Sequence, residues 1–386
     1  MCSVDPSMPP RTSDLKQIRR ALLRWYARNH RRLPWRQTRD PYRILVSEYL
    51  LQQTRVDQAL PFYRRFVGRF PTLRRLAGAP LSAVLKVWQG LGYYGRARSL
   101  HRAARELLGR SDGQIPRSLA ALQKLPGCGT YTSAAVASIA FGVPEPVLDG
   151  NVSRLLSRFC GVRGVPGRSA ILRELRMHAG LLISRGRPGV LNQAMMELGA
   201  TICTPKNPQC GRCCWSRWCI AFREGLTNEL PLRRPRRAVP VRDIAIGIIW
   251  HRNRILIARR RPESLLGGLW EFPGGKRKGR ETLRNCCARE ILEEVGLKVQ
   301  VLHKISVLRY AYTHFKVRLH VFRCAASSDQ ARAIGCDRVV WEYPHRLSRY
   351  AFPTATKRLI EGLSSGSLSP HVSTDQSLLV RGRRIG

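Results

Sequence analysis

The chain has 386 residues, 44% of them hydrophobic, which is enough for two ordinary domains with separate cores. Its 68 Lys and Arg residues outnumber 25 Asp and Glu, and the formal net charge of +43 favours a polyanionic partner, above all nucleic acid. The sequence contains neither a long apolar run nor a secretory signal, which excludes a membrane-spanning or secreted protein. We therefore expect a soluble, cytoplasmic monomer, associated with the nucleoid if the source is bacterial.

Hydrophobic periodicity divides the chain into two domains. Residues 15–222 repeat apolar positions at three- and four-residue steps and predict an all-α domain. Residues 241–363 contain alternating segments such as V-R-D-I-A-I-G-I-I-W and one strong helix near 283–295, which predicts an α/β domain. Between them, the Pro- and Arg-rich residues 223–240 predict an exposed linker, and the Ser-rich residues 364–386 predict a disordered tail.

The segment L-P-G-C-G-T-Y-T-S, residues 125–133, carries a tight glycine turn ahead of a small-residue helix. At Gly127 and Gly129 the backbone N–H groups can face outward and, with the helix dipole, hold a phosphate. The segment resembles the helix-hairpin-helix motif of the endonuclease III superfamily. In the members that also cut the DNA strand, a lysine stands two residues after the second glycine. Tyr131 stands there in this chain, and a phenol cannot form a Schiff base, so base excision alone is favoured.

Two carboxylates are placed for hydrolysis of an N-glycosidic bond, which needs a proton donor for the leaving base and a negative charge near the cationic sugar. Glu48 shares a helix face with Ile44 and Leu51, an apolar setting that raises the pKa of a carboxyl. Asp149 directly precedes a helix, where N–H groups and the helix dipole favour the ionised form. An ordinary helix cap is the alternative for Asp149, and a surface acid is the alternative for Glu48.

Four short motifs are similar to those of MutY-type adenine DNA glycosylases: S-E-Y-L-L-Q-Q-T, G-L-G-Y-Y-G-R-A-R, V-L-D-G-N-V and N-Q-A-M-M-E-L-G-A. The resemblance implies that Glu48 protonates adenine and that Asp149 stabilises the sugar cation, with support from Tyr131 and Asn151. The implied substrate is double-stranded DNA in which adenine lies opposite 8-oxoguanine or guanine.

The same resemblance implies that Gln53 and Tyr93 enter the base stack near the lesion, since the target base must leave the helix. The alternatives are a solvated helix face for Gln52 and Gln53, and an aromatic core for Tyr93 and Tyr94.

Cysteines at 203–219 follow the pattern C-x6-C-x2-C-x5-C through Cys203, Cys210, Cys213 and Cys219. Four thiolates in one loop can hold a [4Fe-4S] cluster, or zinc if their geometry is tetrahedral. Zinc sites usually show two separate C-x2-C pairs, and the spacing resembles the cluster loop of the same glycosylase family. Cys214 competes with Cys213 as a ligand.

Residues 275–297 match the complete Nudix box, which places Glu290, Glu293 and Glu294 on one helix face. A divalent cation such as Mg²⁺ would relieve their repulsion, and a solvated acidic face is the alternative. MutY-type proteins end in a MutT-like domain whose box is generally degraded. The intact box therefore leaves a second, nucleotide-hydrolysing activity open.

The resemblance also implies that Tyr312, Thr313 and His314 recognise 8-oxoguanine, by ring stacking and by hydrogen bonds. The alternative is a plain turn between strands.

Three other functions are compatible with the sequence. The first is an endonuclease III-like glycosylase that also cuts the strand, against which Tyr131 argues. The second is a Nudix pyrophosphohydrolase tethered to DNA by the helical domain. The third is an iron–sulfur module that binds DNA without catalysis.

Overall fold

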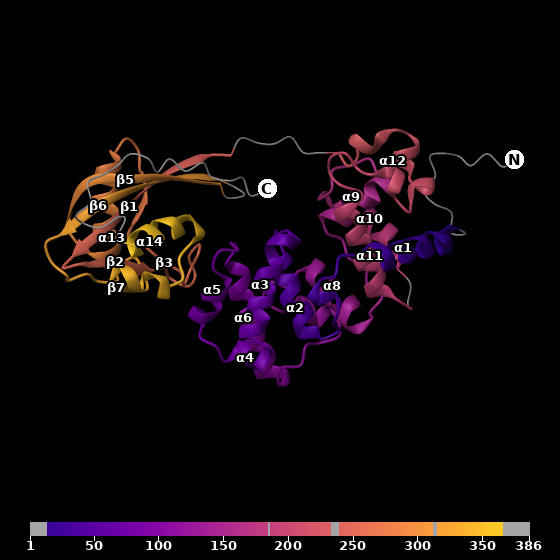
Figure 1. Cartoon of the computed structure of the whole chain (residues 1–386), viewed down its shortest axis with the longest axis horizontal. Coiled ribbons are helices and arrows are strands. Elements are labelled where there is room, and N and C mark those ends of the chain that lie inside the picture. Colours follow the sequence, from indigo (N-terminus) through magenta and orange to yellow (C-terminus); the bar gives the residue numbers. More distant parts are fainter. Residues whose placement is uncertain (1–13, 184–185, 233–238, 312–314, 366–386) are drawn as a thin grey trace. The chain divides into compact units, whose positions relative to one another are not determined.

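The computed structural model describes residues 14–183, 186–232, 239–311 and 315–365. The chain forms two compact units, a helical unit of Met1–Gly78 and Ser99–Arg236 and a sheet unit of Ala79–Arg98 and Arg237–Gly386 (Figure 1). The all-α domain and the α/β domain expected from the sequence are therefore both present. Each described helix is too short or too polar to cross a lipid bilayer.

The helical unit is built from short amphipathic helices joined by tight turns. Its first helix is typical, because Ile18, Leu22 and Tyr26 recur at four-residue steps and are buried. The helices and 3-10 turns are α1 (Leu15–Asn29), η2 (Pro34–Arg36), α2 (Pro41–Leu51), α3 (Val56–Arg69), α4 (Leu73–Ala77), α6 (Gly95–Ser111, which begins in the sheet unit), α7 (Leu119–Gln123), α8 (Thr130–Phe141), α9 (Gly150–Phe159), α10 (Ser169–Leu182), α11 (Pro188–Thr201), η3 (Cys210–Arg212), η4 (Ser216–Trp218), α12 (Ile220–Arg223) and η5 (Leu226–Asn228).

Helix α11 packs unusually close to α8 and α9. A Cβ atom added at Gly189 would lie 2.5 Å from the carbonyl oxygen of Ser138 on α8. A Cβ atom added at Gly199 would lie 2.7 Å from the carbonyl oxygen of Asn151 on α9. Side chains are excluded at both contacts, so the three helices meet backbone to backbone.

The sheet unit has a mixed seven-stranded sheet in the order β3-β2-β1-β6-β5, with β4 paired to β1 and β7 to β2. Strands β1 and β6 run parallel, and the other pairs are antiparallel. The elements are α5 (Leu81–Trp88), β1 (Val241–His251), β2 (Arg254–Arg259), β3 (Trp270–Glu271), β4 (Gly274–Lys276), α13 (Leu283–Val295), β5 (Val299–Ala311), β6 (Lys316–Ala326), β7 (Arg338–Glu342), η6 (Pro344–Arg349), η7 (Thr354–Thr356) and α14 (Lys357–Ser364).

Alternation along the strands places one helix on each face of the sheet. Leu256 packs with Ile291 of α13, whereas its neighbour Ile257 packs with Leu359 of α14. The segment 79–98, which the sequence analysis assigned to the helical domain, groups with this unit.

Candidate active site and cysteine loop

Helix α2 brings Glu48 into the interior of the helical unit. It begins at Pro41, and the Asp40 side chain caps it by accepting the Tyr42 N–H at 2.9 Å. Glu48 is 3% exposed, and burial raises its pKa to about 7. Its Oε2 atom has no hydrogen-bond partner among the described residues. The raised pKa that the sequence predicts for Glu48 is thus confirmed. Because the side chain is buried, the alternative of an acid on the protein surface is excluded.

Two groups from distant parts of the chain surround this carboxyl. The hydroxyl of Tyr131, at the start of α8, donates to Sδ of Met196 at 3.7 Å, and its interaction with Glu48 lowers the pKa of the acid, whereas nearby Asp149 raises it. The pKa of Tyr131 itself is held well above its usual value by burial and by both acids. The structure therefore brings Glu48, Tyr131 and Asp149 together.

Asp149 is the N-cap of α9, but it is also buried. Its Oδ1 accepts the Val152 N–H at 2.6 Å, and its Oδ2 accepts the Asn151 Nδ2 at 3.0 Å. The sequence analysis expected these donors to favour the charged form. They do lower the pKa, but burial is the larger effect and the net direction is upward. Asp149 is therefore both a helix N-cap and an acid close to Glu48, so the two interpretations from the sequence are compatible.

Asn151 connects Asp149 to the cysteine loop. Its Oδ1 accepts from Nη2 of Arg154 at 2.9 Å, and Nε of Arg154 donates to the carbonyl oxygen of Cys203 at 2.8 Å. Arg154 also donates to the carbonyl oxygen of Gly199 at 2.6 Å. A chain of hydrogen bonds thus runs from one of the two acids to the first cysteine of the loop.

The hairpin, residues 125–133, has the backbone geometry that a glycine turn requires. Gly127 has φ +75°, and a Cβ there would lie 2.7 Å from the Cβ of Ser99. Gly129 is the N-cap of α8, which has no side-chain cap, and the space beside its Cα is open. The first N–H groups of α8 are therefore accessible to an anion.

Gln53 and Tyr93 share a strained backbone, although they lie in different units. Their φ angles are +55° and +48°, values that residues other than glycine rarely adopt. Tyr93 is 47% exposed whereas Tyr94 is 2% exposed, so only Tyr94 belongs to a core. Tyr312, Thr313 and His314 lie outside the described residues.

One buried ion pair was missed by the sequence analysis. Glu197 of α11 is fully buried, and its carboxylate accepts from Arg31 at 2.7 Å and from Arg36 at 2.8 Å. These arginines hold its pKa at about 2, and Arg36 also lowers the pKa of Glu48. The motif N-Q-A-M-M-E-L-G-A contained Glu197, but no signal in the sequence linked it to Arg36.

The four predicted cysteine ligands line one hollow. Cys203, Cys210, Cys213 and Cys219 surround it together with apolar rings, whereas Cys214 is not among the lining residues. Nη1 of Arg158 donates to the Cys203 Sγ at 3.4 Å, which places a positive charge beside a thiol.

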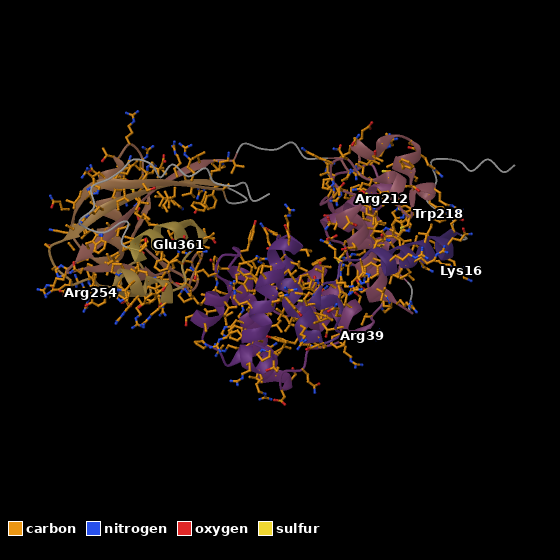
Figure 2. The ribbon with its side chains drawn as sticks, viewed as in Figure 1. Lys16, Arg39, Arg212, Trp218, Arg254 and Glu361 are labelled. Carbon is orange, nitrogen blue, oxygen red and sulfur yellow. The ribbon has the colours of Figure 1, made fainter. Side chains whose placement is uncertain are left out.

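Basic residues of the loop and of both units face solvent. Arg212 is exposed on the loop, as are Lys16 and Arg39 of the helical unit and Arg254 of the sheet unit (Figure 2).

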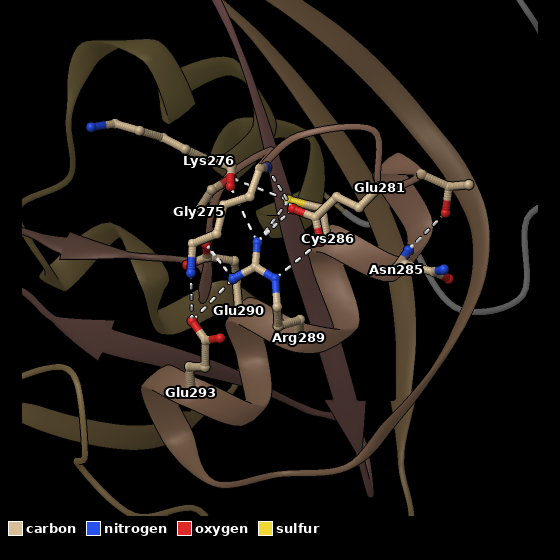
Figure 3. Close-up of polar contacts among 10 residues, drawn as sticks. Gly275, Lys276, Glu281, Asn285, Cys286, Arg289, Glu290 and Glu293 are labelled. Carbon is tan, nitrogen blue, oxygen red and sulfur yellow. Dashed lines mark hydrogen bonds and ion pairs between the residues drawn. The ribbon is translucent and has the colours of Figure 1, made fainter.

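Arg289 binds three acidic side chains of the Nudix box (Figure 3). Its guanidinium donates to Glu281 at 2.6 and 3.0 Å, to Glu290 at 2.8 Å and to Glu293 at 3.0 Å. The arginine holds the pKa of Glu281 at about 2. Glu294 accepts the Gly274 N–H at 3.0 Å instead, and burial raises its pKa to about 7.

This arrangement does not fit a divalent ion in the box. Throughout the part of the chain that the structure describes, no three His, Cys, Asp or Glu side chains converge on a point where they could hold one metal ion. Arg289 compensates the charges of Glu290 and Glu293, two of the three acids whose repulsion a cation was expected to relieve.

The fold and the clustered acids define the class of protein. Residues 46–178 match the family model of the HhH-GPD superfamily base excision DNA repair proteins, and residues 245–362 match the NUDIX domain. A thermostable thymine-DNA glycosylase of known structure is 29% identical, with a TM-score of 0.50, over 55% of this chain and 98% of that protein.

Two curated relatives identify the family. The adenine DNA glycosylase of Rattus norvegicus is 30% identical over 95% of this chain and 83% of the rat protein. That of Homo sapiens is 32% identical over 81% of this chain and 68% of the human protein. The chain belongs to the adenine DNA glycosylase family.

Proposed function

We propose that this chain removes adenine from double-stranded DNA in which the adenine lies opposite 8-oxoguanine or guanine. The observation that carries the proposal is Glu48: a buried carboxyl with an unpartnered oxygen and a pKa of about 7, beside Tyr131 and Asp149. Such an acid holds its proton near neutral pH and has a free oxygen from which to donate it.

The reaction divides between the two acids. Glu48 donates its proton to adenine, and the bonding electron pair of the N-glycosidic bond leaves with the base. The cationic sugar is stabilised by the Asp149 carboxylate, whose charged form is supported by the N–H of Val152 and the amide of Asn151. Water then adds to the sugar and loses its proton, which yields an abasic site.

DNA contacts follow from the exposed turns. The open N-terminus of α8 at Gly129 suits a phosphate. Gln53 and exposed Tyr93 suit insertion into the base stack, because strained backbone holds each in a fixed turn. Recognition of 8-oxoguanine by Tyr312, Thr313 and His314 stays a prediction from the sequence.

Cys203, Cys210, Cys213 and Cys219 would hold a [4Fe-4S] cluster, which supplies a structural anchor for the loop. The support is the shared hollow and the arginine beside Cys203. A cluster binds each thiolate through a separate iron, so the four sulfurs need not converge on one point as zinc would require.

A duplex assay tests the function. We expect excision of adenine opposite 8-oxoguanine, slower excision opposite guanine and none opposite thymine, with alkali used to reveal abasic sites. Borohydride trapping of the protein on DNA would instead favour the strand-cutting alternative. Release of pyrophosphate from 8-oxo-dGTP that disappears in Glu293→Gln would instead favour the Nudix pyrophosphohydrolase alternative.

A further inference from the structure

We propose that Gln52 is a positioning residue that fixes the hairpin to helix α2, and thereby aligns Tyr131 with Glu48 while it holds the DNA-binding turn in place. The inference builds on the proposed roles of Glu48, Tyr131 and Gly129. It assigns a role to the first glutamine of the Q-Q pair, which the sequence analysis considered only as part of a solvated helix face.

One amide group of Gln52 spans the glycine turn. Its Nε2 donates to the carbonyl oxygen of Gly127 at 3.1 Å and to Oγ1 of Thr132 at 3.0 Å. Gly127 lies within the glycine turn, ahead of α8, whereas Thr132 lies near the start of α8. Gln52 thus joins both sides of the turn to the end of α2, while its own N–H donates to the carbonyl oxygen of Glu48 at 3.2 Å.

Two neighbours of Gln52 on the same turn of α2 also face the hairpin. The hydroxyl of Tyr49 donates to the carbonyl oxygen of Pro126, and Glu48 lies beside Tyr131, which lowers the pKa of the acid. Tyr49 therefore holds the entrance of the hairpin, whereas Gln52 holds its exit. Thr132 is adjacent to Tyr131, so loss of the Gln52 contact frees the part of α8 that carries the phenol.

Gln52 also lies next to two residues with proposed DNA contacts, Gln53 and Gly129. Gln52 is the C-cap of α2, and the next residue, Gln53, has a positive φ angle. Gly129 lies between the two hairpin atoms that Gln52 contacts. Movement at Gln52 would therefore change acid alignment, phosphate grip and base-stack insertion together, which distinguishes it from a residue that only stabilises the fold.

The test compares Gln52→Met and Thr132→Val with Gln58→Met, a matched control because Gln58 is exposed on α3. For each, we would measure the single-turnover excision rate on the adenine:8-oxoguanine duplex, the Kd for the abasic product duplex and the thermal unfolding temperature. We expect the rate to fall on the order of 100-fold in Gln52→Met, as for a small misplacement of reacting groups, and less in Thr132→Val, which loses one of two contacts. The product duplex should bind more weakly to both, and Gln58→Met should match wild type.

The pH profile of the rate is the readout that a purely structural role would not move. The groups that act on Glu48 are Tyr131 on α8, Asp149 before α9 and Arg36 in η2, and the Cys128 thiol of the hairpin is also close to it. Since Tyr131 lowers the pKa of Glu48, moving Tyr131 away from Glu48 should shift the alkaline fall in rate to higher pH.

Wild-type rate and pH profile in Gln52→Met would overturn the inference, as would a slower rate with an unshifted profile and a lower unfolding temperature. If Gln52→Met does not fold, Thr132→Val decides on the same criteria. If wild type and Gln58→Met release no adenine, the proposed function fails instead. Hydrogen exchange at residues 127–132 then still tests the positioning role, because faster exchange in Gln52→Met supports it and unchanged exchange refutes it.

Discussion

Replacement of Glu48 by Gln should abolish adenine excision and at the same time stabilise the protein at alkaline pH. The amide has nearly the shape of the acid but cannot donate the proton that the leaving base needs. It also cannot ionise, so the buried site never has to hold a charge. Activity and stability are therefore expected to change in opposite directions.

The size of the stabilisation follows from the pKa of Glu48. Burial raises it from 4.5 to about 7, so the folded protein holds this proton more tightly than the unfolded chain. Below pH 4.5 both states are protonated and the residue costs nothing. Between pH 4.5 and 7 the unfolded state ionises first, and the cost grows to roughly 3 kcal/mol, taking about 1.4 kcal/mol for each pH unit. Above pH 7 the cost stays constant.

Thermal or urea unfolding of wild type and Glu48→Gln at pH 4.5 and pH 8 measures this cost, and single-turnover excision measures activity. The variant should be more stable by roughly 2–3 kcal/mol at pH 8 and nearly equal to wild type at pH 4.5, with duplex affinity retained. A variant that excises adenine at the wild-type rate, or that is less stable than wild type at pH 8, would refute the reasoning.

Three further predictions concern other sites. Arg154→Met should slow excision and lower the iron content together, since Arg154 joins Asn151 to Cys203. The excision rate and the iron content are measured on one preparation, and a variant that keeps both at the wild-type level would contradict the prediction. Cys213→Ser should remove iron and visible absorbance while Cys214→Ser retains them, because only Cys213 lines the hollow; equal loss would reverse the assignment. Arg289→Met should lower the unfolding temperature at pH 7. The difference should shrink as pH falls from 4.5 towards 2, because the low pKa of Glu281 stabilises the fold only while its carboxylate is charged. A difference independent of pH would exclude that charge pairing.

Sequence patterns predicted the parts of the site that depend on local structure. The apolar spacing around Glu48 predicted its raised pKa, and the position of Asp149 predicted its role as an N-cap. The cysteine spacing predicted which thiols share a hollow. In each case neighbours along the chain determine the environment, so the linear sequence contains the information.

Features that depend on long-range packing were not predicted. The net pKa direction of Asp149 depends on burial by other helices, which outweighs its local hydrogen bonds. Glu197 meets Arg36 across 161 positions, and Gln52 meets Thr132 across 80, distances over which no motif applies. In the Nudix box Glu290, Glu293 and Glu294 were recognised, but the guanidinium of Arg289 was not. It binds Glu290, Glu293 and also Glu281, and its side-chain direction is set by the tertiary structure.

The backbone contact between α11 and α9 at Gly199 limits which substitutions this chain can accept. A contact without side chains cannot be relieved by a change of rotamer, so it tolerates no Cβ atom at this position. It places the helix that carries Glu197 at a fixed depth beside Asn151 and Asp149. A single methyl group at position 199 would collide with the α9 backbone at Asn151 and force the two helices apart, so one substitution far from either acid would displace both.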